Sequence, residues 1–113
     1  MPEYLVLIYE DERDWESATE EDESKAMVEH NAFAEKVTAG GGKIVSSNAL
    51  HPTKQATTIR DGVRTAGPFA ETAEQLGGYY LVEARDLDHG LEIGALCPAG
   101  KGCVEVRPVL DFG

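Results

Sequence analysis

The chain has 113 residues, of which 42% are hydrophobic and 27% charged, a composition typical of one globular domain. No apolar stretch approaches the roughly 20 residues that cross a bilayer, and the amino terminus lacks the features of a secretory signal, so we expect a soluble cytoplasmic protein with no membrane partner. The formal net charge of −11 would repel a phosphate backbone, which argues against a nucleic-acid partner. Most of the excess acid lies in residues 10–23, which we interpret as a solvated loop leading into a helix rather than a docking tail or a metal chelator.

The first half of the chain predicts a buried strand, an amphipathic helix and a second strand. Residues 4–9 form an unbroken apolar run, as expected of a central strand covered on both faces. Ser17 and Thr19 are both suitable helix caps, and the triple glycine at 40–42 ends the helix. At 100° per residue the helix has one apolar face, made of Ala26, Met27, His30, Phe33, Ala34 and Val37. Residues 43–50 follow as the second strand.

The second half predicts a hairpin, another central strand, a short helix and a last strand. Residues 56–60 and 63–65 flank an Asp-Gly pair, which is a strong signal for a β-hairpin turn. Residues 79–84 are aromatic and β-branched, as expected of a second central strand. The helix that follows is capped by Asp86 or Asp88, ends before Pro98, and repeats Leu87, Leu91 and Ala95 at four-residue spacing. The last strand is expected at residues 104–110.

This order of elements predicts an α+β, ferredoxin-like fold with an inserted β-hairpin. The two most apolar strands fall in the centre of the sheet, and both helices cover one face of it. Because the central strands place apolar groups on both faces, a monomer would leave a large apolar patch in water. We therefore expect a homodimer built through the sheet.

Several stretches of the sequence resemble one known family. They are GPFAETAEQLGGYYLVEARDLDHGLEIGALCP followed by VEVRPVL and, earlier in the chain, EYLVLIYEDE, GGKIVSSNALHP and ATTIRDG. On these residues the whole chain, 1–113, is similar to the YCII-related (YciI-like) family, in the branch named for a D-G-P-F motif. The resemblance implies a single domain of this type, with a ferredoxin-like chain that pairs into a dimeric α+β barrel.

The resemblance does not transfer every motif residue. Ala66 stands where the motif has its aspartate, so no role of that acid can be carried over. In the YciI branch a helix histidine paired with an aspartate is a proposed catalyst, and His30 is similar in position, but no matching aspartate is identified. Members of the D-G-P-F branch have no settled activity, and some are encoded beside alternative sigma factors. This implies, as an alternative to an enzyme, a sensor or accessory protein linked to transcriptional regulation.

His30 is the candidate catalytic residue. A histidine has its ordinary pKa near neutrality, so one in a cleft beside a carboxylate can act as general acid or base. The alternative is a core histidine with one ring nitrogen bonded to a neighbour. His51 and His89 are both expected at the surface.

Residues 67–78 are the candidate ligand-binding loop. Phe69 is expected to close a pocket for a small-molecule ligand, and Glu71, Thr72 and Gln75 to line it with polar groups. The alternative is that Phe69 anchors the loop on the core and Glu71 caps a turn. We expect this loop and His30 to border one cleft, with Glu71 as the carboxylate near the imidazole.

No metal or cofactor is predicted. The three histidines and two cysteines match no zinc spacing, and there is no calcium loop, phosphate loop or nucleophile motif. Cys97 and Cys103 are expected to be free thiols in a reducing compartment. Three functions remain: a small-molecule enzyme that uses His30, a non-catalytic binder or sensor that uses the same cleft, and a structural role with the acidic segment as contact surface.

Overall fold

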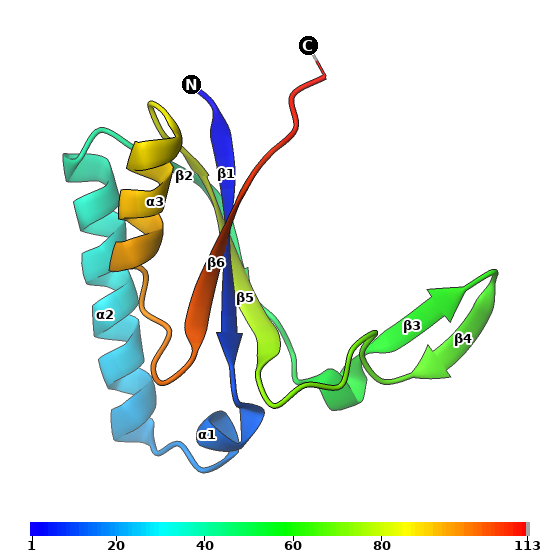
Figure 1. Cartoon of the computed structure of the whole chain (residues 1–113). Helices are drawn as coiled ribbons and strands as arrows, with labels where there is room; N and C mark the ends of the chain where they lie inside the picture. Colours follow the sequence, from blue (N-terminus) through cyan, green and yellow to red (C-terminus); the bar gives the residue numbers. More distant parts are fainter. Residues whose placement is uncertain (113) are drawn as a thin grey trace.

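A computed structural model describes residues 1–112 of the chain (Figure 1). Its main sheet has the strand order β2-β5-β1-β6, and every neighbouring pair is antiparallel. The strands are β1 (Glu3–Glu10), β2 (Lys43–Ala49), β5 (Gln75–Glu83) and β6 (Cys103–Pro108). The two most apolar strands, β1 and β5, lie in the centre, as the sequence predicts. This order is consistent with a ferredoxin-like α+β fold.

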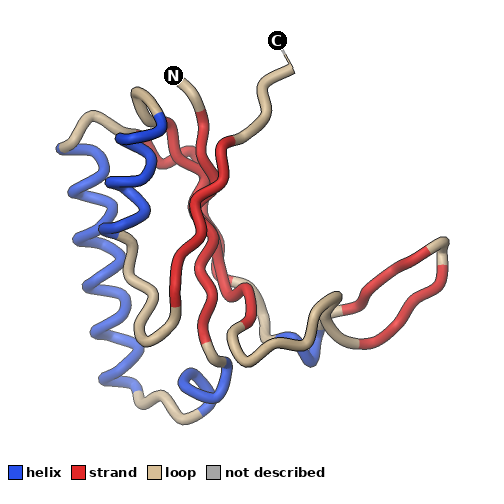
Figure 2. Tube along the Cα trace, viewed as in Figure 1, coloured by secondary structure: helices blue, strands red, loops and turns tan. Residues whose placement is uncertain are grey.

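Two helices, α2 (Glu20–Ala39) and α3 (Leu87–Leu96), cover one face of the sheet (Figures 1 and 2). Alternate residues of a strand point to the same face, so every second residue of the central strands meets the helices. The buried apolar cluster consists of Tyr4, Val6, Ile8, Phe33, Val37, Val82, Ala84, Ile93 and Cys97. Within residues 1–112 the opposite face of the sheet carries no helix.

The chain enters α2 through a short helix that the sequence pattern does not predict. Thr19, not Ser17, caps α2: its hydroxyl accepts from the Asp22 amide at 3.1 Å, and the Asp22 carboxylate accepts from the Thr19 amide at 3.0 Å. Ser17 instead ends α1 (Glu12–Glu16). Asp11 begins α1 by accepting from the amide and the guanidinium of Arg13, which stabilises a helical turn that has no buried residue.

Helix α3 buries a different face from the one that its leucines suggest. Leu87 and Leu91 are exposed, and the buried residues are His89, Gly90, Ile93 and Gly94. A Cβ at Gly90 would lie 3.0 Å from the ring of Tyr4, and a Cβ at Gly94 would lie 2.3 Å from Cγ2 of Val106. The missing side chains let α3 lie close to β1 and β6, which compensates for the low helix propensity of glycine.

The predicted hairpin forms a sheet of its own, made of β3 (Thr57–Arg60) and β4 (Val63–Ala66). Asp61 and Gly62 both have positive φ, 50° and 78°, as a two-residue hairpin turn requires. This hairpin, which we call the arm (residues 57–66), projects from one end of the main sheet on the side away from α2 and α3 (Figure 1). Within residues 1–112 its strands pair only with each other.

We predict that Gly94→Ala destabilises the fold, although alanine favours a helix by about 1 kcal/mol over glycine. The new methyl group would meet Val106, whose β-branched side chain has little freedom to move aside, and such overpacking costs ~1–3 kcal/mol. Chemical denaturation of the parent, Gly94→Ala, Val106→Ala and the double variant measures the effect. The double variant should lose less stability than the two single losses added together, whereas additive losses would contradict the steric explanation.

Candidate functional site

A cavity of about 610 Å³ lies between the start of α2, α1 and one end of the main sheet. Its walls come from strands β1, β2 and β5 as well as from both helices. Two of the residues that the sequence marks as functional, His30 and Gln75, line it. An adjoining hollow of about 590 Å³ between α2 and β2 shares His30 and Tyr80 with the cavity, so the imidazole stands where the two spaces meet.

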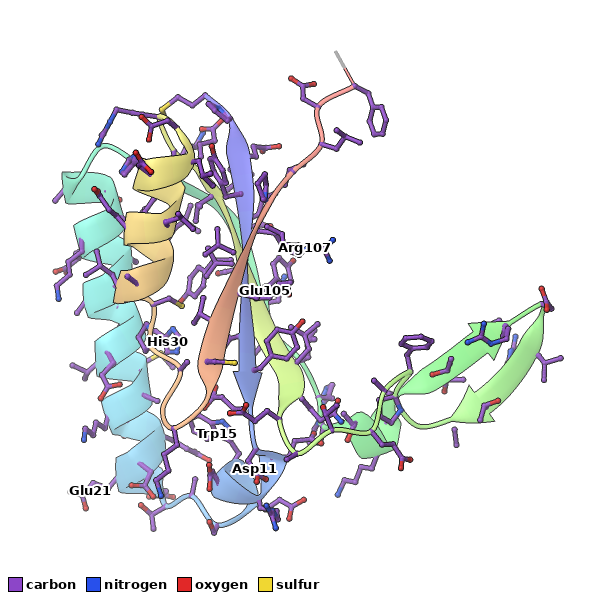
Figure 3. All side chains as sticks on the ribbon, viewed as in Figure 1. Asp11, Trp15, Glu21, His30, Glu105 and Arg107 are labelled. Atoms are coloured by element: carbon purple, nitrogen blue, oxygen red, sulfur yellow. The ribbon has the colours of Figure 1, made fainter. Side chains whose placement is uncertain are left out.

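His30 occupies the middle of the inward face of α2, as the helical spacing predicts, and points toward the sheet (Figure 3). Its Nδ1 lies 2.7 Å from the hydroxyl oxygen of Tyr80 on β5. The two rings are nearly parallel, at 17°, with centroids 5.8 Å apart. On its other side Tyr80 makes a T-shaped contact with Phe33, with centroids 4.8 Å apart. The imidazole is therefore held in position by a central strand of the sheet.

The hydrogen bond to Tyr80 leaves the second ring nitrogen of His30 without a partner among residues 1–112. When the tyrosine donates to Nδ1, Nε2 carries the ring proton, and when Nδ1 donates, Nε2 is an acceptor. Burial raises the pKa of Tyr80, so its hydroxyl stays protonated at neutral pH and can take either role. The free nitrogen can thus give or accept a proton from a bound molecule.

Glu10, at the end of β1, is a carboxylate of this site that sequence reasoning missed. It lines the cavity with His30, and its Oε2 accepts a hydrogen bond from Nε1 of Trp15 at 2.9 Å. Burial raises the pKa of Glu10 above its ordinary value of 4.5, while the Trp15 hydrogen bond and the nearby His30 oppose that rise. The only sequence signal was its place, since Glu10 is the acid that ends the apolar run of β1. Glu10 is thus the carboxylate near His30, a role that we expected of Glu71.

The loop at residues 67–78 reaches the cavity only at its end. Gln75, the first residue of β5, lines the cavity and donates from its amide to the carbonyl of Thr72 at 3.1 Å. Phe69 is 81% exposed and lies beside the arm, with its ring centroid 5.9 Å from the guanidinium carbon of Arg60. Within one chain Phe69, Glu71 and Thr72 do not line the cavity with His30. Their assignment to a binding site stays a prediction.

The other two histidines differ from each other in position. His51 is exposed, as expected, and lies on the cavity wall where the chain leads toward the arm. His89 was expected at the surface but is only 4% exposed. Its Nδ1 accepts from the Arg85 amide at 3.0 Å, and its own amide donates to the Asp86 carboxylate at 2.9 Å. Because Gly90 brings α3 close to the sheet, this first-turn residue is buried and satisfies a loop amide.

Both cysteines are free thiols, Cys97 buried and Cys103 exposed. Burial raises the pKa of Cys97 to about 12, so this thiol is a packing group rather than a nucleophile. In the part of the chain that the structure describes, no three His, Cys, Asp or Glu side chains are grouped to hold a metal ion. None of the helices in residues 1–112 is both long enough and apolar enough to span a membrane.

We predict that Glu10 makes the fold less stable as pH rises. A carboxyl group whose pKa is raised by folding binds its proton more tightly in the folded state than in the unfolded state. Between the two pKa values the folded state holds more protons, and stability is lost as pH increases from 4.5 through the higher folded value. Glu10→Gln keeps an oxygen for Trp15 and removes the charge. The free energy of unfolding of Glu10→Gln, relative to that of the parent, should therefore increase as pH rises over this range.

Urea denaturation at several pH values measures this difference. Glu16→Gln, which removes one charge from an exposed side chain of α1, is the matched control. A stability difference between Glu10→Gln and the parent that does not change with pH would contradict a buried, destabilising carboxylate.

Comparison with known proteins agrees with the resemblance to the YCII-related family noted in the sequence. The model of the YCII-related domain matches residues 2–113. An uncharacterized protein of Rhizobium meliloti (strain 1021) is 34% identical over 113 residues, an alignment that covers 94% of this chain and 90% of that protein. A match of this extent spans the cavity, both main helices and the arm, and the chain belongs to the YCII-related family.

Proposed function

We propose that this protein binds a small molecule in the cavity beside His30 and transfers a proton to or from it, with the imidazole as general acid or base. The observation that carries the proposal is the 2.7 Å contact between His30 Nδ1 and the Tyr80 hydroxyl at the wall of the 610 Å³ cavity. That volume falls in the range of about 300–1,000 Å³ found for small-molecule sites. The contact orients the imidazole and leaves Nε2 for the ligand.

The three polar groups at the cavity would have separate roles. Tyr80 fixes the orientation of the ring through its contact with Nδ1, where its hydroxyl can either donate or accept. Glu10 supplies a carboxylate that lines the same cavity and is near enough to His30 to interact with it electrostatically. Trp15 holds Glu10 through its indole N–H at 2.9 Å and adds apolar surface to the cavity wall. A positioned base with a supporting carboxylate is the arrangement that proton transfer uses.

The second candidate function is a non-catalytic binder or sensor that uses the same cavity. Ala66 favours this function, because it stands where the D-G-P-F motif has its aspartate. The chain therefore keeps the cavity but lacks any role that this acid would have. Gly67, Pro68 and Phe69 support placing the chain in that branch, and the branch suggests a link to transcriptional regulation. We place the protein in the cytoplasm under either function.

Deuterium exchange separates the two functions. In D₂O, with a panel of small carbonyl compounds whose C–H bonds are acidic, the parent should catalyse exchange into at least one compound that binds. His30→Gln should lower that rate by ~10²–10⁴-fold, the usual contribution of a general acid or base. Glu29→Gln, an exposed neighbour on α2, should leave the rate unchanged.

Two outcomes of this experiment would argue against catalysis by His30. Binding that shifts the Trp15 indole NMR signal without any exchange would favour the binder, and exchange that survives His30→Gln would exclude this histidine as the acid or base.

We also propose that the chain forms a homodimer through the open face of the main sheet, as a dimeric α+β barrel. Leu5 on β1 and Leu81 on β5 are cross-strand partners, so they share one face, and it is not the face of the core cluster. Glu105 and Arg107 on β6 flank them and point away from the helices (Figure 3). An apolar centre with a polar rim is the usual composition of a protein interface.

Light scattering at micromolar concentration should give about twice the mass of one chain. Leu81→Glu should shift the protein toward the monomer, because it buries an unpaired charge in the interface. Leu91→Glu makes the same change on the exposed side of α3 and should leave the dimer intact. A monomeric parent would contradict the proposed assembly.

A further inference from the structure

The arm exposes apolar side chains that no other part of residues 1–112 covers. Ile59 is 63% exposed and Val63 65%, and Phe69 beside the arm is 81% exposed. A two-stranded hairpin with no further sheet or helix against it is marginally stable in water. The arm therefore needs a surface to pack on.

The arm is also the basic part of an acidic protein. Residues 51–70, which hold the arm and its base, contain three basic residues and one acid, although the whole chain has a net charge of −11. Arg60 lies on β3 and Arg64 on β4, and neither guanidinium has an ion-pair partner among residues 1–112. Arg60 shares one face of the arm with Val63, its cross-strand partner, and its guanidinium lies near the ring of Phe69.

Surface of the opposite charge surrounds the mouth of the cavity. Residues 10–23 contain nine acids and one base, and three glutamates of the chain, Glu10, Glu12 and Glu23, line the cavity. In residues 1–112 no lysine or arginine lines it. Trp15 and Met27 on the same wall are 43% and 64% exposed, so apolar surface and negative charge lie side by side in water.

A chain cannot place its own arm on its own cavity. The Glu12 carboxylate accepts from the amide of Thr53 at 2.7 Å and from the threonine hydroxyl, which ties the base of the arm to α1. From this attachment the arm leads away from α2 and its cavity (Figure 1). A second copy of the chain can present its arm where the first cannot.

We propose that the arm of each protomer docks on the acidic mouth of its partner's cavity. Arg60 faces the partner's carboxylates, while Val63 and Phe69 cover its exposed Trp15 and Met27. Because each copy gives one arm and receives one, the exchange closes with two-fold symmetry. Each cavity is then completed by residues of the other chain, including Phe69. This inference rests on the proposed dimer and does not require proton transfer by His30.

Trp15 is the only tryptophan of the chain, so its fluorescence reports on the mouth of the cavity. In the parent dimer the docked arm should protect Trp15 from quenching by acrylamide. Arg60→Glu/Arg64→Glu should remove this protection and shift the emission to longer wavelength, and Arg60→Glu alone should have a larger effect than Arg64→Glu alone. The control Lys36→Glu/Lys43→Glu makes the same change in charge away from the arm and should quench as the parent does.

Two further measurements test whether docking of the arm depends on charge and whether it requires the arm itself. At ~1 M NaCl, where the Debye length is about 3 Å, the parent should lose its protection and quench like the charge-reversed variant. The amide of Gly67 donates to the carbonyl of Ala56 at 2.8 Å, so residues 57–66 can be replaced by two glycines without moving the ends of the arm. This shortened chain should quench like Arg60→Glu/Arg64→Glu.

The quenching measurements and light scattering together decide the proposal. Loss of Trp15 protection in arm variants that remain dimeric supports arm docking. Dissociation of the arm variants, while the lysine control stays dimeric, supports it as well. A monomeric parent, or equal quenching in the parent, the control and both dimeric arm variants, would overturn it. An inactive protein with a protected Trp15 would contradict only the proposed proton transfer.

Discussion

The hydroxyl and ring of Tyr80 connect the helix that carries the candidate base to the centre of the sheet. Tyr80 lies on β5, opposite Val6 of β1 and Ser47 of β2, so hydrogen-bonded strands hold its backbone on both sides. His30 and Phe33 are three residues apart on α2 and therefore lie on one face, which lets both contact the same tyrosine. The position of the imidazole over the cavity follows from these two contacts.

The features that the sequence predicts well are those that depend on local periodicity. The apolar run of residues 4–9 identifies β1 as a central strand, and the Asp61-Gly62 pair locates the turn of the arm. The face of α3 could not be predicted in this way, because hydrophobicity favours its leucines. Packing instead depends on what fits against Tyr4 and Val106, and only glycine leaves enough room there. Helix α1 was missed because it buries no residue, so it leaves no apolar periodicity in the sequence.

Local periodicity also predicts part of the candidate site. Helical spacing places His30 on the inward face of α2, but its partners come from the end of β1 and the middle of β5, which only the folded sheet brings together. Glu71 was expected near His30 because the loop at residues 67–78 was expected to border the same cleft. Only the end of that loop, at Gln75, Gly77 and Gly78, meets the cavity, since the preceding residues return from the arm. The residues of the loop nearest the arm, Phe69, Glu71 and Thr72, therefore do not line the cavity of their own chain.

The acidic segment and the basic arm connect assembly to the chemistry of the cavity. The pKa of Glu10 is raised by burial, and the neighbouring Asp14 raises it further, so the carboxylate is less favoured in an isolated chain than in water. A guanidinium within about 4–6 Å of a carboxylate favours its charged form. An arm docked at the partner's cavity mouth would therefore lower the pKa of Glu10. By linkage, ionisation of Glu10 would strengthen docking by the same free energy. The charge of the carboxylate that lines the cavity with His30 would then depend on the presence of the second chain.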